Sequence, residues 1–152
     1  MPNNFLKHFR REYLVGKIDE KDLLEDPHYQ FMEWLEDATR SGIDDPNAMA
    51  LATVDPSGRP SLRTVLLKDA RQEGYVFVTH YNSRKAKELA SNHFAAISLF
   101  WPGLERQIRI EGKAEKLSSA ESDELFNDRP AESRIAAIIS PQSQVLESRD
   151  QL

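Results

Sequence analysis

Cysteine is absent from this 152-residue sequence, and glycine occurs only six times. Without cysteine the chain can form no disulfide bond, no thiolate metal site and no thiol nucleophile, which fits a cytoplasmic protein. The glycines form no Gly-x-Gly-x-x-Gly, Gly-x-Ser-x-Gly or Gly-Lys-Ser motif, so a glycine-rich phosphate loop and a serine-hydrolase elbow are excluded. A nucleotide that binds must therefore be held by side chains and by the end of a helix.

Long hydrophobic runs and export signals are also missing. No apolar stretch approaches the roughly 20 residues that a membrane-spanning helix requires. The N-terminal Met1-Pro2-Asn3-Asn4 leads into no basic segment followed by an apolar one, so we expect a cytoplasmic location rather than export. The four histidines are scattered, with no His-x-x-x-His pair, and they predict no metal site. With 39% hydrophobic and 30% charged residues, the chain has the composition of a soluble globular domain.

Positive charge is scarce overall but concentrated in one region. The chain carries a net charge of −5, yet six basic and only two acidic residues lie between Arg63 and Lys87. This region therefore has a local charge of +4, which leaves −9 for the rest of the chain. A nucleic-acid binder usually has a broad basic footprint, with aromatic residues interleaved as stacking sites, and neither feature is present here. The concentration points instead to a small bound anion.

The second half of this basic region is a predicted helix start. Ser83 is a typical N-cap, and Arg84, Lys85 and Lys87 fall in the first turn. Cations at that position oppose the helix dipole, but they become favourable when a phosphate sits over the helix start. The alternative is a solvated, lysine-rich helix face. Because the segment follows an apolar strand and a short turn, we favour phosphate binding.

Hydrophobic periodicity and turn residues predict a mainly β protein with several helices. Strands are expected at Ala48–Val54, Ser61–Lys68, Glu73–Thr79, Ala95–Trp101 and Arg106–Glu115, and helices from Pro27 to before Gly42, from Ser83 to about Asn92, from Ser118 to before Pro130, and at Ile135–Ile139. Residues 1–27 are highly charged and are expected to form an arm, while residues 28–152 form the domain. Five strands joined mostly by short turns predict an antiparallel barrel with peripheral helices.

The spacing of Arg63 and Lys68 constrains the shape of a shared ligand. On a regular strand, side chains five residues apart face opposite sides. Both cations reach one ligand only if it lies along the strand or if the strand is bulged. A long ligand with a phosphate at one end and a flat ring at the other would meet this condition. Gln107, on a later strand, is by itself explained as an exposed strand residue.

Several segments together resemble the pyridoxamine 5′-phosphate oxidases, which are FMN-binding split-barrel enzymes. The likeness rests on the order and spacing of Arg10-Arg11-Glu12-Tyr13, Ala50-Leu51-Ala52-Thr53-Val54-Asp55, Arg63-Thr64-Val65-Leu66-Leu67-Lys68, Asn82-Ser83-Arg84-Lys85-Ala86, Leu104-Glu105-Arg106-Gln107, Arg129-Pro130 and Pro141-Gln142-Ser143-Gln144. The resemblance implies a mainly β protein with an antiparallel, Greek-key split β-barrel and peripheral helices.

The resemblance also implies a set of binding residues and no catalytic side chain. FMN would be contacted by Arg63, Thr64, Val65, Leu66, Leu67, Lys68, Val78, Thr79, Arg84, Lys85, Gln107, Gln142 and Ser143, and the substrate by Arg10, Arg11, Glu12, Tyr13, Lys68, Arg129 and Ser133. In this family Gln107, Gln142 and Ser143 would serve the FMN of the neighbouring subunit, which implies a homodimer. The reaction would be oxidation of pyridoxamine or pyridoxine 5′-phosphate to pyridoxal 5′-phosphate, in which the flavin takes a hydride and O2 reoxidises it.

Two departures from the family pattern open an alternative. Leu125 stands where the family has a tyrosine at the substrate phosphate, and the sequence ends before the family's tryptophan, its Arg-x-His motif and a further FMN-contacting arginine. We therefore expect the domain to be incomplete at its C-terminus. The alternative is an FMN-binding split-barrel protein that is non-catalytic or has another specificity.

Overall fold

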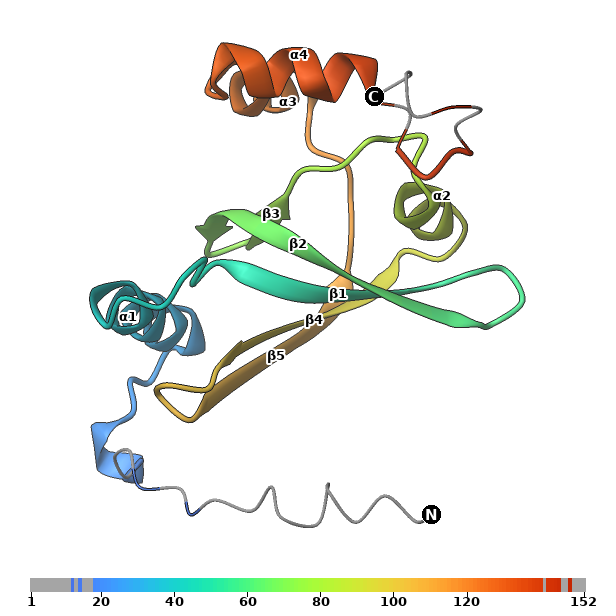
Figure 1. The fold of residues 1–152 in the computed structure, drawn as a ribbon. Helices are drawn as coiled ribbons and strands as arrows, with labels where there is room; N and C mark the ends of the chain where they lie inside the picture. Colours follow the sequence, from blue (N-terminus) through green and yellow to red (C-terminus); the bar gives the residue numbers. More distant parts are fainter. Residues whose placement is uncertain (1–11, 13, 15–17, 141, 146–147, 149–152) are drawn as a thin grey trace, which may run out of the picture. The chain divides into compact units, whose positions relative to one another are not determined.

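The computed structural model describes residues 12, 14, 18–140, 142–145 and 148 (Figure 1). The predicted substrate residues Arg10, Arg11 and Tyr13 lie outside the described residues. The chain forms two compact units, which are Met1–Pro46 with Phe100–Ile108, and Asn47–Leu99 with Arg109–Leu152. The predicted division at residue 27 stays a prediction.

The first unit is built around helix α1 (Pro27–Arg40), which follows a single-turn 3-10 helix at Glu20–Asp22. Helix α1 begins and ends as its sequence predicts. The side chain of Asp26 accepts a hydrogen bond from the backbone N–H of His28 at 2.8 Å, and Gly42 follows the helix with φ +75°. Phe31 and Ala38 are its buried residues.

The turn between the last two strands packs within this same unit. Trp101 is buried, and its Nε1 donates a hydrogen bond to the carbonyl of Pro46 at 2.8 Å. The guanidinium of Arg106 lies 5.0 Å from the centre of the Trp34 ring and 2.8 Å from the carboxylate of Asp37. An aromatic contact and an ion pair therefore tie this turn to α1.

The five strands form one sheet in the order β3-β2-β1-β4-β5. They are β1 (Ala48–Val54), β2 (Pro60–Arg71), β3 (Gly74–Phe77), β4 (Phe94–Trp101) and β5 (Arg106–Lys113). Strand β1 pairs antiparallel with β2 and with β4, and β2 pairs antiparallel with β3. A fourth strand that returns beside the first is the Greek-key arrangement. The predicted fold class is confirmed.

Strand β2 is longer than predicted because it changes partner along its length. Its first part, Pro60–Leu66, pairs with β1, and its last part, Leu67–Arg71, pairs with β3. Leu67 is opposite Phe77 and Asp69 is opposite Val76, so Lys68 is an extra residue in a β-bulge. The bulge that would let Arg63 and Lys68 share a ligand is therefore present.

Alternating side chains of β1 form the core of the second unit. Met49, Leu51 and Thr53 are buried, while the residues between them are half-buried. Leu67 of β2 and Leu99 of β4 are also buried. Thr53 is the polar member of this row, and its hydroxyl has to find hydrogen-bond partners inside the protein.

Three helices complete the second unit: α2 (Arg84–Ser91), α3 (Ser119–Asn127) and α4 (Ala131–Ile139). Ser118 and Glu121 form the predicted capping box at the start of α3. Helix α4 begins at Ala131 rather than at the predicted Ile135, because its first turn is mostly polar and lacks the apolar pattern on which the prediction rested. Among the described helices, none has the length and apolar character needed to cross a bilayer.

Candidate anion-binding site

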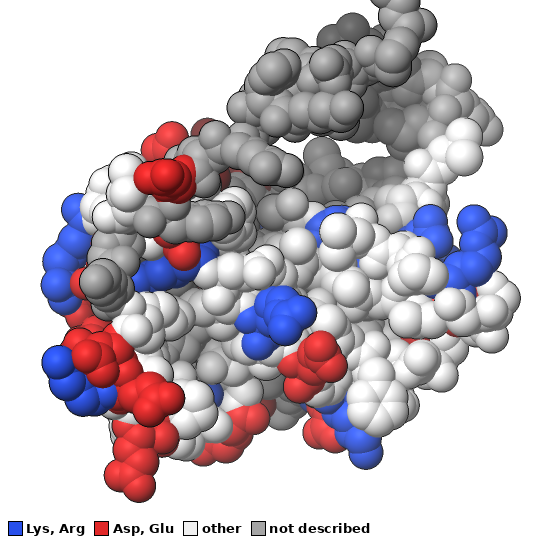
Figure 2. All heavy atoms as spheres, turned by 90° about the horizontal axis from the view of Figure 1, so that it is seen from below, with Lys and Arg blue, Asp and Glu red and all other residues white. Residues whose placement is uncertain are grey.

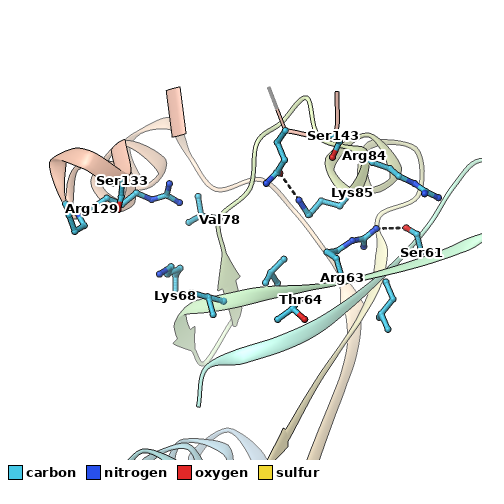
Figure 3. Close-up of a pocket in the computed structure, with 15 residues that line it drawn as sticks. Ser61, Arg63, Thr64, Lys68, Val78, Arg84, Lys85, Arg129, Ser133 and Ser143 are labelled. Atoms are coloured by element: carbon cyan, nitrogen blue, oxygen red, sulfur yellow. Dashed lines mark hydrogen bonds between the residues drawn. The ribbon is translucent and has the colours of Figure 1, made fainter. Parts of the chain in front are cut away.

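A cavity of about 730 Å³ lies in the second unit, alongside β2 (Figure 3). Its lining consists of Ser61, Leu62, Arg63, Thr64, Val65, Leu66, Lys68, Val78, Arg84, Lys85, Arg129, Pro130, Ser133, Gln142 and Ser143. Five of these fifteen residues are Arg or Lys and none is Asp or Glu. In a chain of net charge −5, such a lining selects for an anion.

The basic residues stand on two sides of the cavity. Figure 3 shows Lys68, Arg129 and Ser133 toward one side, and Arg84, Lys85 and Ser143 toward the other. The first side combines the bulge of β2 with the residues around the α3–α4 junction. The second combines the N-terminal end of α2 with the segment 142–145. A single elongated anion or two separate anions would each match this distribution.

Ser83 caps α2 as its sequence predicts. Its side chain is fully buried, and its hydroxyl oxygen accepts a hydrogen bond from the backbone N–H of Ala86 at 3.4 Å. The same hydroxyl lies 3.2 Å from the hydroxyl of Thr79. These contacts fix the first turn of α2, whose N–H groups make a helix N-terminus favourable for an anion.

Lys85 is a buried cation without a carboxylate partner among the described residues. It is 9% exposed, and its Nζ donates to Gln142 Oε1 at 2.8 Å and to Thr79 Oγ1 at 3.1 Å. Burial, and then the charge of nearby Arg63, lower the pKa of Lys85 below its ordinary value. Both effects disfavour the charged form, and the attraction of an anion in the cavity would offset them.

The arginines at this end are already paired, with one buried carboxylate. Glu88, which is 4% exposed, lies one helical turn after Arg84 and accepts from Arg84 Nε at 2.7 Å and from Arg63 Nη2 at 3.1 Å. Its Oε2 also accepts from Ser61 Oγ at 2.6 Å and from Thr53 Oγ1. Burial by itself would raise the pKa of Glu88, but these hydrogen bonds outweigh it and lower the pKa to about 2.

Arg63 is held more completely than Arg84. Its Nη1 donates to the Leu51 carbonyl at 3.0 Å and to Thr53 Oγ1 at 2.5 Å, and its Nη2 donates to Ser61 as well as to Glu88. The four Nη hydrogens are thus used inside the protein. Arg63 contributes charge to the cavity. Arg84, whose side chain is 59% exposed, donates to Glu88 through Nε, and its Nη groups have no partner among the described residues.

The opposite side of the cavity holds two further cations that have no ion-pair partner among the described residues. Lys68 is exposed at the bulge, and Arg129 is half-buried in the loop after α3. Arg71, also in the basic region of the sequence, is not part of this group. It pairs with Asp69 and with Glu121 of α3, each at 2.6 Å.

Not every predicted binding residue lines the cavity. Leu67 is buried in the core, and Thr79 accepts a hydrogen bond from Lys85 without lining the cavity itself. Gln107 and Glu12 are exposed and are not among the lining residues. Whether these and the lining residues contact a ligand stays a prediction. The sequence reading missed Ser61, Leu62 and Pro130 in the lining and Glu88 behind it. The i, i+4 spacing of Arg84 and Glu88 predicts an ion pair on the helix, but it gives no sign that Glu88 is buried.

One other face of the molecule carries mixed charges. Figure 2 shows a face on which described acidic side chains lie among Lys and Arg rather than apart from them. Among the described residues, no group of three or more His, Asp and Glu side chains is arranged to hold a metal ion. The cavity is therefore the site whose composition calls for a ligand.

A family model and individual relatives place the chain in the same family. The family model described as pyridoxamine 5′-phosphate oxidase matches residues 35–152, which is most of the chain. The chain belongs to the pyridoxamine 5′-phosphate oxidase family. The pyridoxine/pyridoxamine 5′-phosphate oxidase of Paraburkholderia xenovorans is 48% identical over 147 residues, covering 97% of this chain and 69% of that protein. The protein of the same name from Neisseria meningitidis is 44% identical over 144 residues, 95% of this chain and 69% of that one.

Two solved structures are similar to this chain in fold. PhzG from Burkholderia lata, in complex with tetrahydrophenazine-1-carboxylic acid, is 32% identical with a TM-score of 0.82, covering 86% of this chain and 64% of PhzG. A pyridoxamine 5′-phosphate oxidase-related, FMN binding protein from Nostoc punctiforme has a TM-score of 0.65 at 19% identity, covering 85% and 72%. The second likeness shows the fold, which is that of the FMN-binding split-barrel proteins.

Proposed function

We propose that the chain binds FMN in the cavity along β2 and serves as an FMN-dependent oxidase of pyridoxamine and pyridoxine 5′-phosphates. The observation that carries the proposal is the lining of five cations and no acid, with Lys85 buried and lacking a carboxylate partner among the described residues. A volume of about 730 Å³ lies within the range of cofactor sites. Family membership supports the identity of the ligand.

The phosphate of FMN would occupy the α2 end of the cavity. Lys85 and the Nη groups of Arg84 would donate to it, together with the first N–H groups of the helix. The flavin ring would lie along the Thr64–Leu66 stretch of β2, with Val78 against it. Gln142 and Ser143 line the rim of this chain's own cavity, although the family resemblance assigns them to the FMN of the neighbouring subunit. The residues present fit a flat ring that ends in a phosphate.

The other side of the cavity would hold the phosphate of the substrate. Lys68 and Arg129 supply positive charge there, and Ser133 supplies a hydroxyl donor. Bound FMN supplies the chemistry, because it accepts a hydride and is reoxidised by O2, which yields H2O2. The chain's own residues bind the two phosphates and hold the substrate carbon beside the ring, and such positioning accounts for several kcal/mol of a barrier.

We also propose that the functional form is a homodimer. Gln107 is exposed on β5 and does not line the cavity of its own chain. In the family arrangement that residue serves the flavin of the neighbouring subunit. A dimer would also cover sheet edges, which otherwise present unpaired backbone groups.

A second candidate is an FMN-binding protein that is non-catalytic or acts on a different substrate. Leu125 of α3 supplies no hydroxyl where the family has a tyrosine. PhzG, which is 32% identical to this chain, binds tetrahydrophenazine-1-carboxylic acid, so the fold accommodates ligands other than B6 phosphates. Flavin binding is common to both candidates, and turnover separates them.

Titration of the purified protein with FMN, followed by flavin fluorescence, tests the cofactor. We expect binding in the wild type and its loss in the Arg84→Ala/Lys85→Ala double variant, because charge-assisted bonds to phosphate contribute about 1.5 to 3 kcal/mol each. The control is Lys21→Ala/Arg40→Ala, which removes the same charge from an exposed surface. Unchanged affinity in the first variant would remove the phosphate site.

Turnover is then measured with pyridoxamine 5′-phosphate at saturating FMN, by formation of pyridoxal 5′-phosphate and H2O2. Formation of both products supports the oxidase. FMN binding without either product supports the second candidate. A wild type that binds no FMN contradicts both.

A further inference from the structure

Glu88 lies behind the cavity lining and is the most buried charged side chain among the described residues, at 4% exposed. We propose that Glu88 is a positioning residue that holds the cations at the α2 end in the arrangement that fits a phosphate dianion. The inference rests on the proposed FMN site. It assigns to Glu88 a role in specificity for the phosphorylated over the unphosphorylated flavin.

The two oxygens of Glu88 hold different elements. Oε1 accepts from Arg84 Nε on the same helix at 2.7 Å. Oε2 accepts from Thr53 of β1 and from Ser61 and Arg63 of β2. The carboxylate therefore fastens the start of α2 to two strands, and it sets the direction in which Arg84 leaves the helix.

Cross-strand register explains how β2 supplies its share of these contacts. Thr53 of β1 is opposite Ser61 of β2, and Leu51 is opposite Arg63. Arg63 therefore reaches back over β1 to the Leu51 carbonyl and to Thr53 Oγ1, whose own hydroxyl donates to Glu88. With its four Nη hydrogens engaged, Arg63 braces the cluster, and Arg84 and Lys85 remain as direct phosphate donors.

The charge of the cluster also depends on Glu88. Arg63, Arg84 and Lys85 carry three positive charges, and Glu88 reduces the sum to +2. A phosphate monoester carries a charge of about −1.5 to −2 at neutral pH. The cluster with Glu88 therefore matches the charge of a phosphate dianion. Without Glu88 it would carry +3, and no carboxylate would offset the repulsion among Arg63, Arg84 and Lys85.

Proton transfer is not the task of this carboxylate. Its hydrogen bonds lower the pKa of Glu88 to about 2 despite burial, which alone would raise it. Both oxygens already accept hydrogen bonds from protein donors. A group so occupied does not accept a proton near neutral pH, so Glu88 acts through Arg63 and Arg84.

The test compares the affinities of FMN and riboflavin, which differ only by the phosphate, for each variant. In Glu88→Gln the charge is lost and an N–H₂ group faces some of the former donors. We expect the ratio of riboflavin Kd to FMN Kd to fall by about tenfold or more. Glu88→Asp, which keeps the charge, is expected to restore part of the ratio.

A purely structural role would weaken both flavins equally and leave the ratio unchanged, and that result would overturn the proposal. If Glu88→Gln does not fold, Thr53→Val carries the test, because Thr53 is fully buried, does not line the cavity and donates to Glu88. We expect its ratio to fall as well, and an unchanged ratio would overturn the proposal. The control is Thr39→Val on α1, whose hydroxyl donates to the Leu35 carbonyl. A wild type that binds neither flavin would instead contradict the proposed function.

Discussion

Replacing Lys85 with methionine should weaken FMN binding and at the same time stabilise the ligand-free protein. The two side chains are of similar length, so Lys85→Met removes the charge with little change in packing. In the ligand-free protein the cation is 9% exposed and its Nζ contacts only the neutral atoms Thr79 Oγ1 and Gln142 Oε1 among the described residues. A site of this kind favours ligand binding at the expense of stability.

The magnitudes follow from the two environments. Replacing a buried charge by an apolar side chain stabilises a protein by about 1 kcal/mol or more when the charge is poorly matched. For a domain of this size, 1 kcal/mol raises Tm by about 2 to 4 °C. Loss of one charge-assisted bond to phosphate costs about 1.5 to 3 kcal/mol, which weakens FMN binding by roughly 10- to 150-fold.

The pH dependence of Tm provides an independent check. The pKa of Lys85 is lowered from 10.5 by burial and by Arg63, so the folded state releases its proton more readily than the unfolded state. The loss of folding stability caused by the buried charge is therefore fully present below the folded-state pKa of Lys85. It disappears as pH rises to 10.5. The Tm advantage of Lys85→Met should shrink over that interval.

Calorimetry of the ligand-free protein in a phosphate-free buffer measures both Tm values. Lys87→Met is the control, because Lys87 is exposed on the same helix and should leave Tm and FMN affinity nearly unchanged. A lower Tm in Lys85→Met at every pH would refute the reasoning. It would mean that the bonds to Thr79 and Gln142 outweigh the burial of the charge.

Three further predictions concern acid stability, the substrate side and assembly. The pKa of Glu88 is lowered from 4.5 to about 2, so its stabilisation is present above pH 4.5 and is lost as pH falls toward 2. In Glu88→Gln the free energy of unfolding, measured with urea, should therefore fall less steeply over this pH range than in the wild type. An unchanged dependence on pH contradicts this. Arg71→Gln removes the ion pair between β2 and Glu121 of α3, and the loop after α3 carries Arg129. The variant should therefore raise KM for pyridoxamine 5′-phosphate and leave FMN affinity unchanged. An unchanged KM would show that the ion pair is not needed to position α3. Light scattering should give the mass of a dimer; a monomer that retains FMN would disprove that assembly.

Local sequence signals were sufficient to predict most of the fold. Asp26, Ser83 and Ser118 cap their helices as expected, since capping depends only on residues within one turn. Strand β1 has the predicted bounds because its pattern and its flanking turns agree. Strand β2 runs past its predicted end, because its pairing with β3 is a tertiary contact that no local pattern records.

The arrangement of the site was only partly predictable. The concentration of basic residues identified the region. The spacing of Arg63 and Lys68 left two alternatives, a ligand along the strand or a bulge in the strand, and the structure contains the bulge. The internal use of Arg63 depends on the cross-strand register with Leu51, which becomes known only when β1 and β2 are paired. Glu88 was missed because a single acid on an exposed-looking helix has the same pattern whether it faces solvent or a buried arginine.

Because β2 changes its pairing partner along its length, a ligand in the cavity would stabilise two strand pairings at once. One half of the strand is hydrogen-bonded to β1 and the other half to β3, with the bulge at Lys68 where the pairing passes from one to the other. A ligand lying along β2 would therefore span both ladders across the bulge. Its binding free energy would protect the amides of β1 and β3 from hydrogen exchange together, as one cooperative unit, although no contact with β3 is needed.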